Sequence, residues 1–140
     1  MVSNRIGLSM AVFAAVALAG CATTHGSLAS SAERLERNAV ELQSDARDDG
    51  ASGSYSRDAQ EFAAEARDFR RVLTDRDADE DDVEDAFRDL SGRYHALRDE
   101  VERSRDRDAE LDFKQVTEAY LDVEREMRRV GDRDRYARDD

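Results

Sequence analysis

Four runs of apolar residues, each spaced by alternating steps of four and three, constrain most strongly what this chain can fold into. Such spacing places every member of a run on one face of an α-helix, whereas a strand would require alternation by two. The first two runs are Leu28, Ala32, Leu35, Ala39, Leu42, Ala46 and Tyr55, Ala59, Phe62, Ala66, Phe69, Leu73. The last two are Val83, Phe87, Leu90, Tyr94, Leu97, Val101 and Ala109, Phe113, Val116, Tyr120, Val123, Met127, Val130. The sequence therefore predicts four amphipathic helices. Val40, Ala63, Val72, Ala86 and Ala119 are expected to widen these faces.

The segments between the runs are polar and short, which predicts that successive helices are antiparallel neighbours. Residues 49–54 form a small-residue loop, and residues 104–108 are wholly polar. Ser30 and Glu33 have the spacing of a capping box near the first helix start, and Gly131 is expected to end the last helix. We predict an all-α, up-down-up-down four-helix bundle over residues 27–131. Residues 132–140, which alternate Asp with Arg, are expected to form a disordered charged tail.

The first twenty residues differ in composition from the rest of the chain. Arg5 is the only charged residue before Cys21, and a mostly apolar stretch follows from Ile6 to Leu18. This stretch is shorter than the roughly 20 residues that a permanent membrane-spanning helix needs. A single early cation, a short apolar region and small residues after it are typical of a cleaved signal peptide, which we assign to residues 1–20.

Leu18-Ala19-Gly20-Cys21 closes this export segment. The four residues resemble the lipobox of bacterial lipoproteins. The resemblance implies that the Cys21 thiol receives a diacylglycerol and that a peptidase cuts on its N-terminal side. A non-acidic residue after the cysteine, here Ala22, implies sorting to the outer membrane, facing the periplasm. The resemblance covers the export segment only, and the mature chain resembles no named family.

Several acyl chains on one residue hold a protein stably on a membrane, at roughly 0.8 kcal/mol per buried methylene. Residues 21–26 are then the lipidated cysteine and a short tether. Removal of residues 1–20 takes away Arg5 and no acid, which leaves 21 basic against 34 acidic residues and changes the net charge from −12 to −13. Anionic lipid and nucleic acid repel such a surface, so nucleic acid is not an expected partner.

Residues that could carry catalysis or hold a cofactor do not form recognisable patterns. Paired Glu-x-x-His motifs for iron are absent because the residue three before His95 is Gly92, and His25 lies in the tether. Asp75, Asp77 and Asp79 occupy the first, third and fifth places of a calcium loop. The sixth place is Glu80 rather than glycine, however, and the twelfth is Ala86 rather than glutamate. The acids over residues 75–85 are better explained as the start of a helix.

Two functional hypotheses remain. The favoured one is a noncatalytic envelope lipoprotein that acts as a structural or protein-interaction module, with no cofactor. Its partners would be the membrane, through acyl chains on Cys21, and another envelope protein or a second copy of the chain. The alternative is a periplasmic binding protein for a small ligand or a divalent cation, which would use the bundle interior or the acids over residues 75–85.

Overall fold

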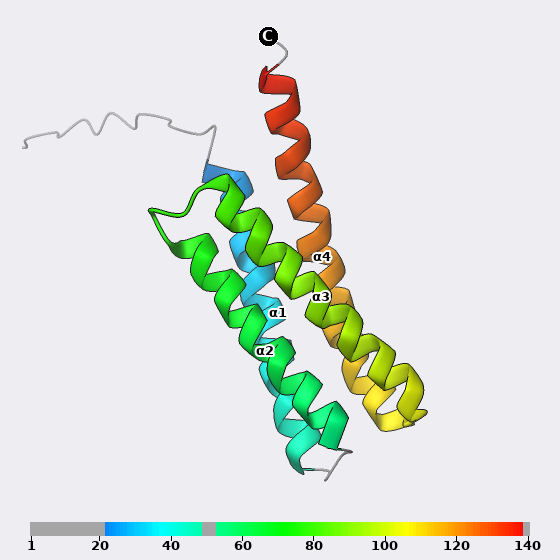
Figure 1. Cartoon of the computed structure of the whole chain (residues 1–140). Coiled ribbons are helices and arrows are strands. Elements are labelled where there is room, and N and C mark those ends of the chain that lie inside the picture. Colours follow the sequence, from blue (N-terminus) through cyan, green and yellow to red (C-terminus); the bar gives the residue numbers. More distant parts are fainter. Residues whose placement is uncertain (1–21, 49–52, 139–140) are drawn as a thin grey trace, which may run out of the picture.

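The computed structural model describes the backbone of residues 22–48 and 53–138, and the side chains of residues 26–48 and 53–131. Four helices make up this part of the chain, without a strand: α1 (Ala22–Asp48), α2 (Gly53–Thr74), α3 (Glu80–Ser104) and α4 (Arg107–Arg138). They run alternately up and down as one bundle (Figure 1). The predicted all-α four-helix bundle is confirmed. The predicted signal peptide and Cys21 lie outside the described residues.

The core consists of the residues that the apolar spacing selected. Along α1, Leu28, Leu35 and Leu42 are at most 2% exposed, and three alanines alternate with them. On α2, Phe62 and Phe69 are equally buried, again with alanines between them. Alternation of large and small side chains along both helices lets the helices pack closely. Burial of each Leu or Phe contributes about 1.5 to 3 kcal/mol, and this apolar burial drives closure of the bundle.

The four seams of the bundle are not equivalent. The backbones of α1 and α2, of α2 and α3, and of α1 and α4 approach within 8 Å along their lengths, whereas those of α3 and α4 do so at few positions. Aromatic rings fill the α3–α4 seam. Phe87, Tyr120, Tyr94 and Phe113 stack in that order, alternating between the two helices, with ring centroids 6.2, 3.8 and 5.5 Å apart. The rings hold the two backbones apart.

The predicted start of α1 and the predicted end of α4 are wrong. First, α1 begins at Ala22, so residues 22–26 extend the first helix instead of forming a tether, and Ser30 lies within the helix rather than at its cap. Second, α4 continues through Gly131 as far as Arg138, so residues 132–138 are helical rather than a disordered tail. No proline interrupts either extension, and a single glycine costs a helix only about 1 kcal/mol. Local continuation of the helix outweighed the weak end signals.

The start of α3 agrees with its acidic sequence. Asp79 is the N-cap: its side chain accepts a hydrogen bond from the Asp82 backbone N–H at 3.0 Å, and the Asp82 side chain accepts one from the Asp79 N–H at 3.1 Å. Glu80, Asp81 and Asp82 form the first turn, where carboxylates interact favourably with the helix dipole. The acids therefore stabilise a helix start.

The bundle has two ends that we name by the direction of α1. At the proximal end α1 begins, α2 ends, α3 begins and α4 ends; at the distal end the chain turns from α1 to α2 and from α3 to α4 (Figure 1). The core is less completely covered at the proximal end. The apolar side chains that pack against the core but stay partly exposed are Leu73, Val83, Ala86, Phe87, Met127 and Val130. All six lie toward the proximal end.

Candidate functional site

The only site residue that the sequence assigns is Cys21, and it lies outside the described residues. What the structure adds is the position of its neighbour, since α1 begins at Ala22. A group attached to Cys21 is thus one residue from the first turn of the bundle, at its proximal end. The features below are the surfaces and polar clusters that the described residues place around the bundle.

The turn between α2 and α3 crosses the proximal end and carries the predicted acidic cluster. Thr74 Oγ1 closes α2 by donating to the carbonyl oxygens of Arg70 and Arg71, at 3.1 and 3.0 Å. Asp75 Oδ1 accepts from the Asp77 backbone N–H at 3.0 Å, while Asp79 caps α3. Among the described residues, no group of three or more His, Cys, Asp or Glu side chains is arranged to hold a metal ion. The carboxylates of Asp75 and Asp79 serve the backbone of the turn.

An open groove follows the α3–α4 seam near the proximal end. Phe87 and Met127 contribute its apolar part, and Ser91, Gly131, Glu84, Arg88 and Arg128 line the remainder. Phe87 is also the last ring of the aromatic stack, so the groove lies where the stack ends. Both arginines have acidic partners: Arg88 contacts Asp85 at 2.5 Å and Arg128 contacts Glu124 at 2.9 Å. The groove therefore combines an apolar floor with a rim of paired charges.

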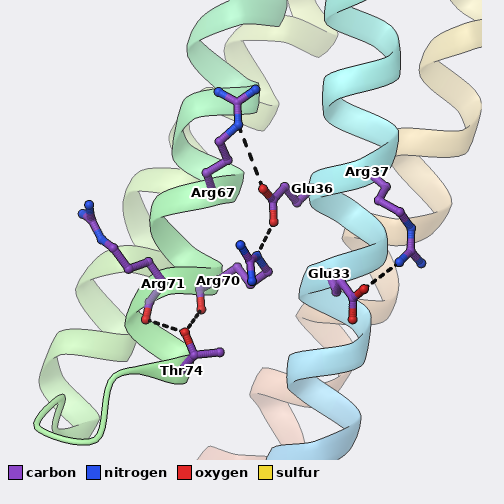
Figure 2. Close-up of polar contacts among 7 residues, drawn as sticks. All are labelled: Glu33, Glu36, Arg37, Arg67, Arg70, Arg71 and Thr74. Atoms are coloured by element: carbon purple, nitrogen blue, oxygen red, sulfur yellow. Dashed lines mark hydrogen bonds and ion pairs between the residues drawn. The ribbon is translucent and has the colours of Figure 1, made fainter.

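A second open groove lies between α1 and α2, with charged residues around Val40, which is 38% exposed. Val40 was expected to face the core and instead faces solvent. Figure 2 shows the polar contacts here: Glu36 on α1 accepts from Arg70 on α2 and lies 4.0 Å from Arg67, while Glu33 binds Arg37 within α1 at 2.8 Å. Glu36 is largely covered by these neighbours. The contacts join the outer faces of the two helices.

Acids four residues before an arginine recur along the helices and could form ion pairs, but only some do; these spacings are Glu33–Arg37, Glu84–Arg88, Asp89–Arg93, Asp99–Arg103 and Glu124–Arg128. Glu33–Arg37 and Glu124–Arg128 are present. The arginines of the other three spacings bind different acids: Arg88 binds Asp85, Arg93 binds Glu61 on α2, and Arg103 binds Glu100. Apart from Arg103–Glu100, whose carboxylate is buried, these pairs are exposed and contribute about 0 to 1 kcal/mol each, so their rearrangement has little effect on stability.

A buried carboxylate, which no sequence pattern indicated, lies toward the distal end between α2 and α3. Glu100 is only 7% exposed, accepts a hydrogen bond from Ser54 Oγ and pairs with Arg103 at 2.5 Å. Burial, and then the negative charge of Glu100, raise the pKa of the nearby Asp58 carboxyl. Glu100 sits one residue before the apolar position Val101, which is why the apolar spacing could not distinguish it from a surface acid.

The remaining residues with possible chemistry, His95 and Tyr120, contact neighbouring side chains of the bundle. His95 is exposed at the edge of the Tyr94 ring, with centroids 5.4 Å apart, as expected for a residue beside the apolar face. The Tyr120 hydroxyl lies 2.8 Å from Ser91 Oγ, and burial raises the pKa of Tyr120. Within the described residues, none of the helices is long and apolar enough to cross a membrane. Comparisons with family models, curated proteins and solved structures give no match to this chain.

Proposed function

We propose that this chain is a bacterial envelope lipoprotein, anchored by acyl chains on Cys21 to the outer membrane and facing the periplasm, and that it acts as a noncatalytic structural or interaction module. The observation that carries the proposal is the junction between the two parts of the chain. The lipobox ends at Cys21 and the bundle begins at Ala22, so the anchor continues directly into α1.

The distribution of partly exposed core side chains supports the proposal that the proximal end faces the membrane. The apolar side chains that pack against the core but stay partly exposed gather there, whereas the core positions toward the distal end are buried. An incompletely buried apolar side chain costs less free energy beside a lipid surface than in bulk water. An anchor attached one residue before α1 would hold this end of the bundle closest to the lipid.

Interaction through the surface is favoured over binding in the interior. In the described residues the interior is filled by the bundle's own side chains, and both grooves are open with charged rims. Such surfaces suit contacts with another protein better than they suit enclosure of a small molecule, since small-molecule sites bury most of their ligand.

Membrane fractionation tests the anchor. The expected result is that the chain remains in the membrane fraction after a wash at 1 M salt and after carbonate at high pH, and leaves it only in detergent. A net charge of −12 for the whole chain gives no electrostatic attraction to anionic lipid. Release by salt alone would show peripheral binding through charge and would overturn the proposal.

A further inference from the structure

The turn between α3 and α4 is short and strained. Only Arg105 and Asp106 separate the two helices, and Arg105 adopts a left-handed conformation with φ 53° and ψ 25°. In the part of the chain that the structure describes, it is the only non-glycine residue with positive φ. This conformation is unfavourable for a residue that has a β-carbon.

The sequence around this turn is compatible with a continuous helix. The chain contains no proline, and residues 93–130 contain no glycine. Residues 102–108 are all exposed, so apolar packing does not hold the turn closed. Its local contacts are polar: Ser104 Oγ donates to the Val101 carbonyl at 2.8 Å and accepts from the Asp106 N–H at 3.2 Å. Water can replace such exposed hydrogen bonds at little cost.

The contacts that hold α4 in the bundle do not involve the turn. On one side α4 meets α1: Asp122 pairs with Arg34, the Gln115 carbonyl accepts from Asn38 at 3.0 Å, and Glu126 accepts from Ser27 at 2.9 Å. On the other side its rings stack with those of α3. The α4 of a second copy could make all of these contacts with α1 and α3 of the first.

We propose that two copies of this chain exchange α4, with the Ser104–Arg107 turn opening so that α3 leads into α4 without reversing. The exchanged dimer keeps the core contacts of the monomer and relieves the left-handed conformation in both copies, a situation in which short strained connections favour exchange. The occupant of the α4 position is thus a second copy of this chain. The exchange requires neither the anchor nor an envelope location, so it stands or falls separately from the proposed function.

The strain at Arg105 is tested by two substitutions, of which glycine removes the left-handed strain and alanine retains it. The full chain carrying Cys21→Ser, in mild detergent, is measured by light scattering over a range of concentrations. Arg105→Gly should raise the dimer dissociation constant by about tenfold or more relative to Arg105→Ala, because glycine adopts the left-handed turn without cost and alanine favours the open helix. Lys114→Gly and Lys114→Ala, on an exposed turn of α4, are the matched controls and should not reproduce this difference.

Either of two results would overturn the exchange: an Arg105→Ala protein that stays monomeric at every concentration, or Arg105→Gly and Arg105→Ala proteins that dimerise equally.

A second experiment distinguishes exchange from side-by-side association. One copy carries Arg34→Asp and the other Asp122→Arg, and the two are unfolded and refolded together. Exchange restores both ion pairs only in the mixed dimer, so mixed dimers should exceed the statistical one-half. A statistical mixture would contradict α4 exchange.

Discussion

The rings of Tyr94 on α3 and Tyr120 on α4 lie nearly parallel, with an interplanar angle of 6° and centroids 3.8 Å apart. Each hydroxyl has a polar neighbour on the opposite helix, Thr117 Oγ1 for Tyr94 at 3.3 Å and Ser91 Oγ for Tyr120 at 2.8 Å. This pair is the centre of the aromatic stack that joins α3 and α4, the neighbouring helices whose backbones approach each other at the fewest positions. It makes the α3–α4 seam depend on ring packing.

Replacement of the ring at the centre of this seam should be costly. We expect Tyr120→Ala to lower the free energy of unfolding by about 3 to 5 kcal/mol, because it removes the ring between Tyr94 and Phe87. Tyr120→Phe keeps the ring and loses only the hydroxyl contact with Ser91, so it should cost about 0.5 to 1.5 kcal/mol. Urea unfolding followed by circular dichroism measures both. Equal losses in the two variants would show that ring packing does not hold the seam.

Two leucines of opposite exposure test the assignment of the core. Leu97 is fully buried and Leu111 is 59% exposed, although both lie in amphipathic helices. Leu97→Ala should cost about 2 to 5 kcal/mol through lost burial and the cavity left behind. Leu111→Ala is the matched control and should change stability by no more than about 0.5 kcal/mol. Thermal unfolding that ranks the two variants the other way would contradict the packing.

Asp58 gives the fold a pH dependence with a definite sign. Its pKa is raised above 3.8 in the folded chain by burial and by Glu100, so the folded state binds the proton more tightly than the unfolded state does. Ionised Asp58 therefore costs stability above its folded pKa, and the cost disappears as pH falls through that value toward 3.8. Asp58→Asn should be more stable than the wild type near pH 7, and the difference should shrink toward pH 4. A difference independent of pH would remove Asp58 as its source.

The acidic turn at the proximal end is expected to respond to cations without selectivity. Asp75 and Asp79 accept hydrogen bonds from backbone N–H groups, and position 80 lacks the glycine that a calcium loop requires. Calorimetric titration should show weak, similar effects of calcium and magnesium through charge screening. A saturable isotherm of about one calcium per chain, lost in Asp77→Asn, would instead support a cation-binding function.

The apolar spacing predicted the fold because almost every position in the apolar runs has a side chain that faces the core. Leu35, Phe62, Leu90 and Val116 are all fully buried, as a one-sided pattern with helical period requires. The helix ends were harder to predict. Ser30 and Gly131 carry real end signals, but each is worth about 1 kcal/mol, and continuation of the helix on both sides outweighed them.

The polar contacts were harder to predict, because their partners often lie on other helices. The spacing of residues within one helix does not show which partners these are. Arg93 could pair with Asp89 within its own helix, yet it binds Glu61 on α2 at 2.5 Å. Glu100 is buried because Ser54 and Arg103 surround it, and Ser54 is 46 residues away in the sequence. The proposed anchor site, in contrast, rests on local sequence alone. Cys21 was assigned entirely from its sequence context and lies outside the described residues.

Metabolic labelling with a palmitate analogue tests whether Cys21 carries the proposed lipid anchor, directly joined to the bundle. Cells expressing the wild-type chain or Cys21→Ser are labelled and fractionated, and the chain is detected by size. We expect a labelled wild-type chain, shortened by the 20 residues before Cys21 and found in the outer membrane. The Cys21→Ser chain should be unlabelled and either unprocessed or soluble, because serine is not an acceptor for this lipid. An unlabelled wild-type chain, or a Cys21→Ser chain that is processed and retained on the membrane like the wild type, would contradict the account.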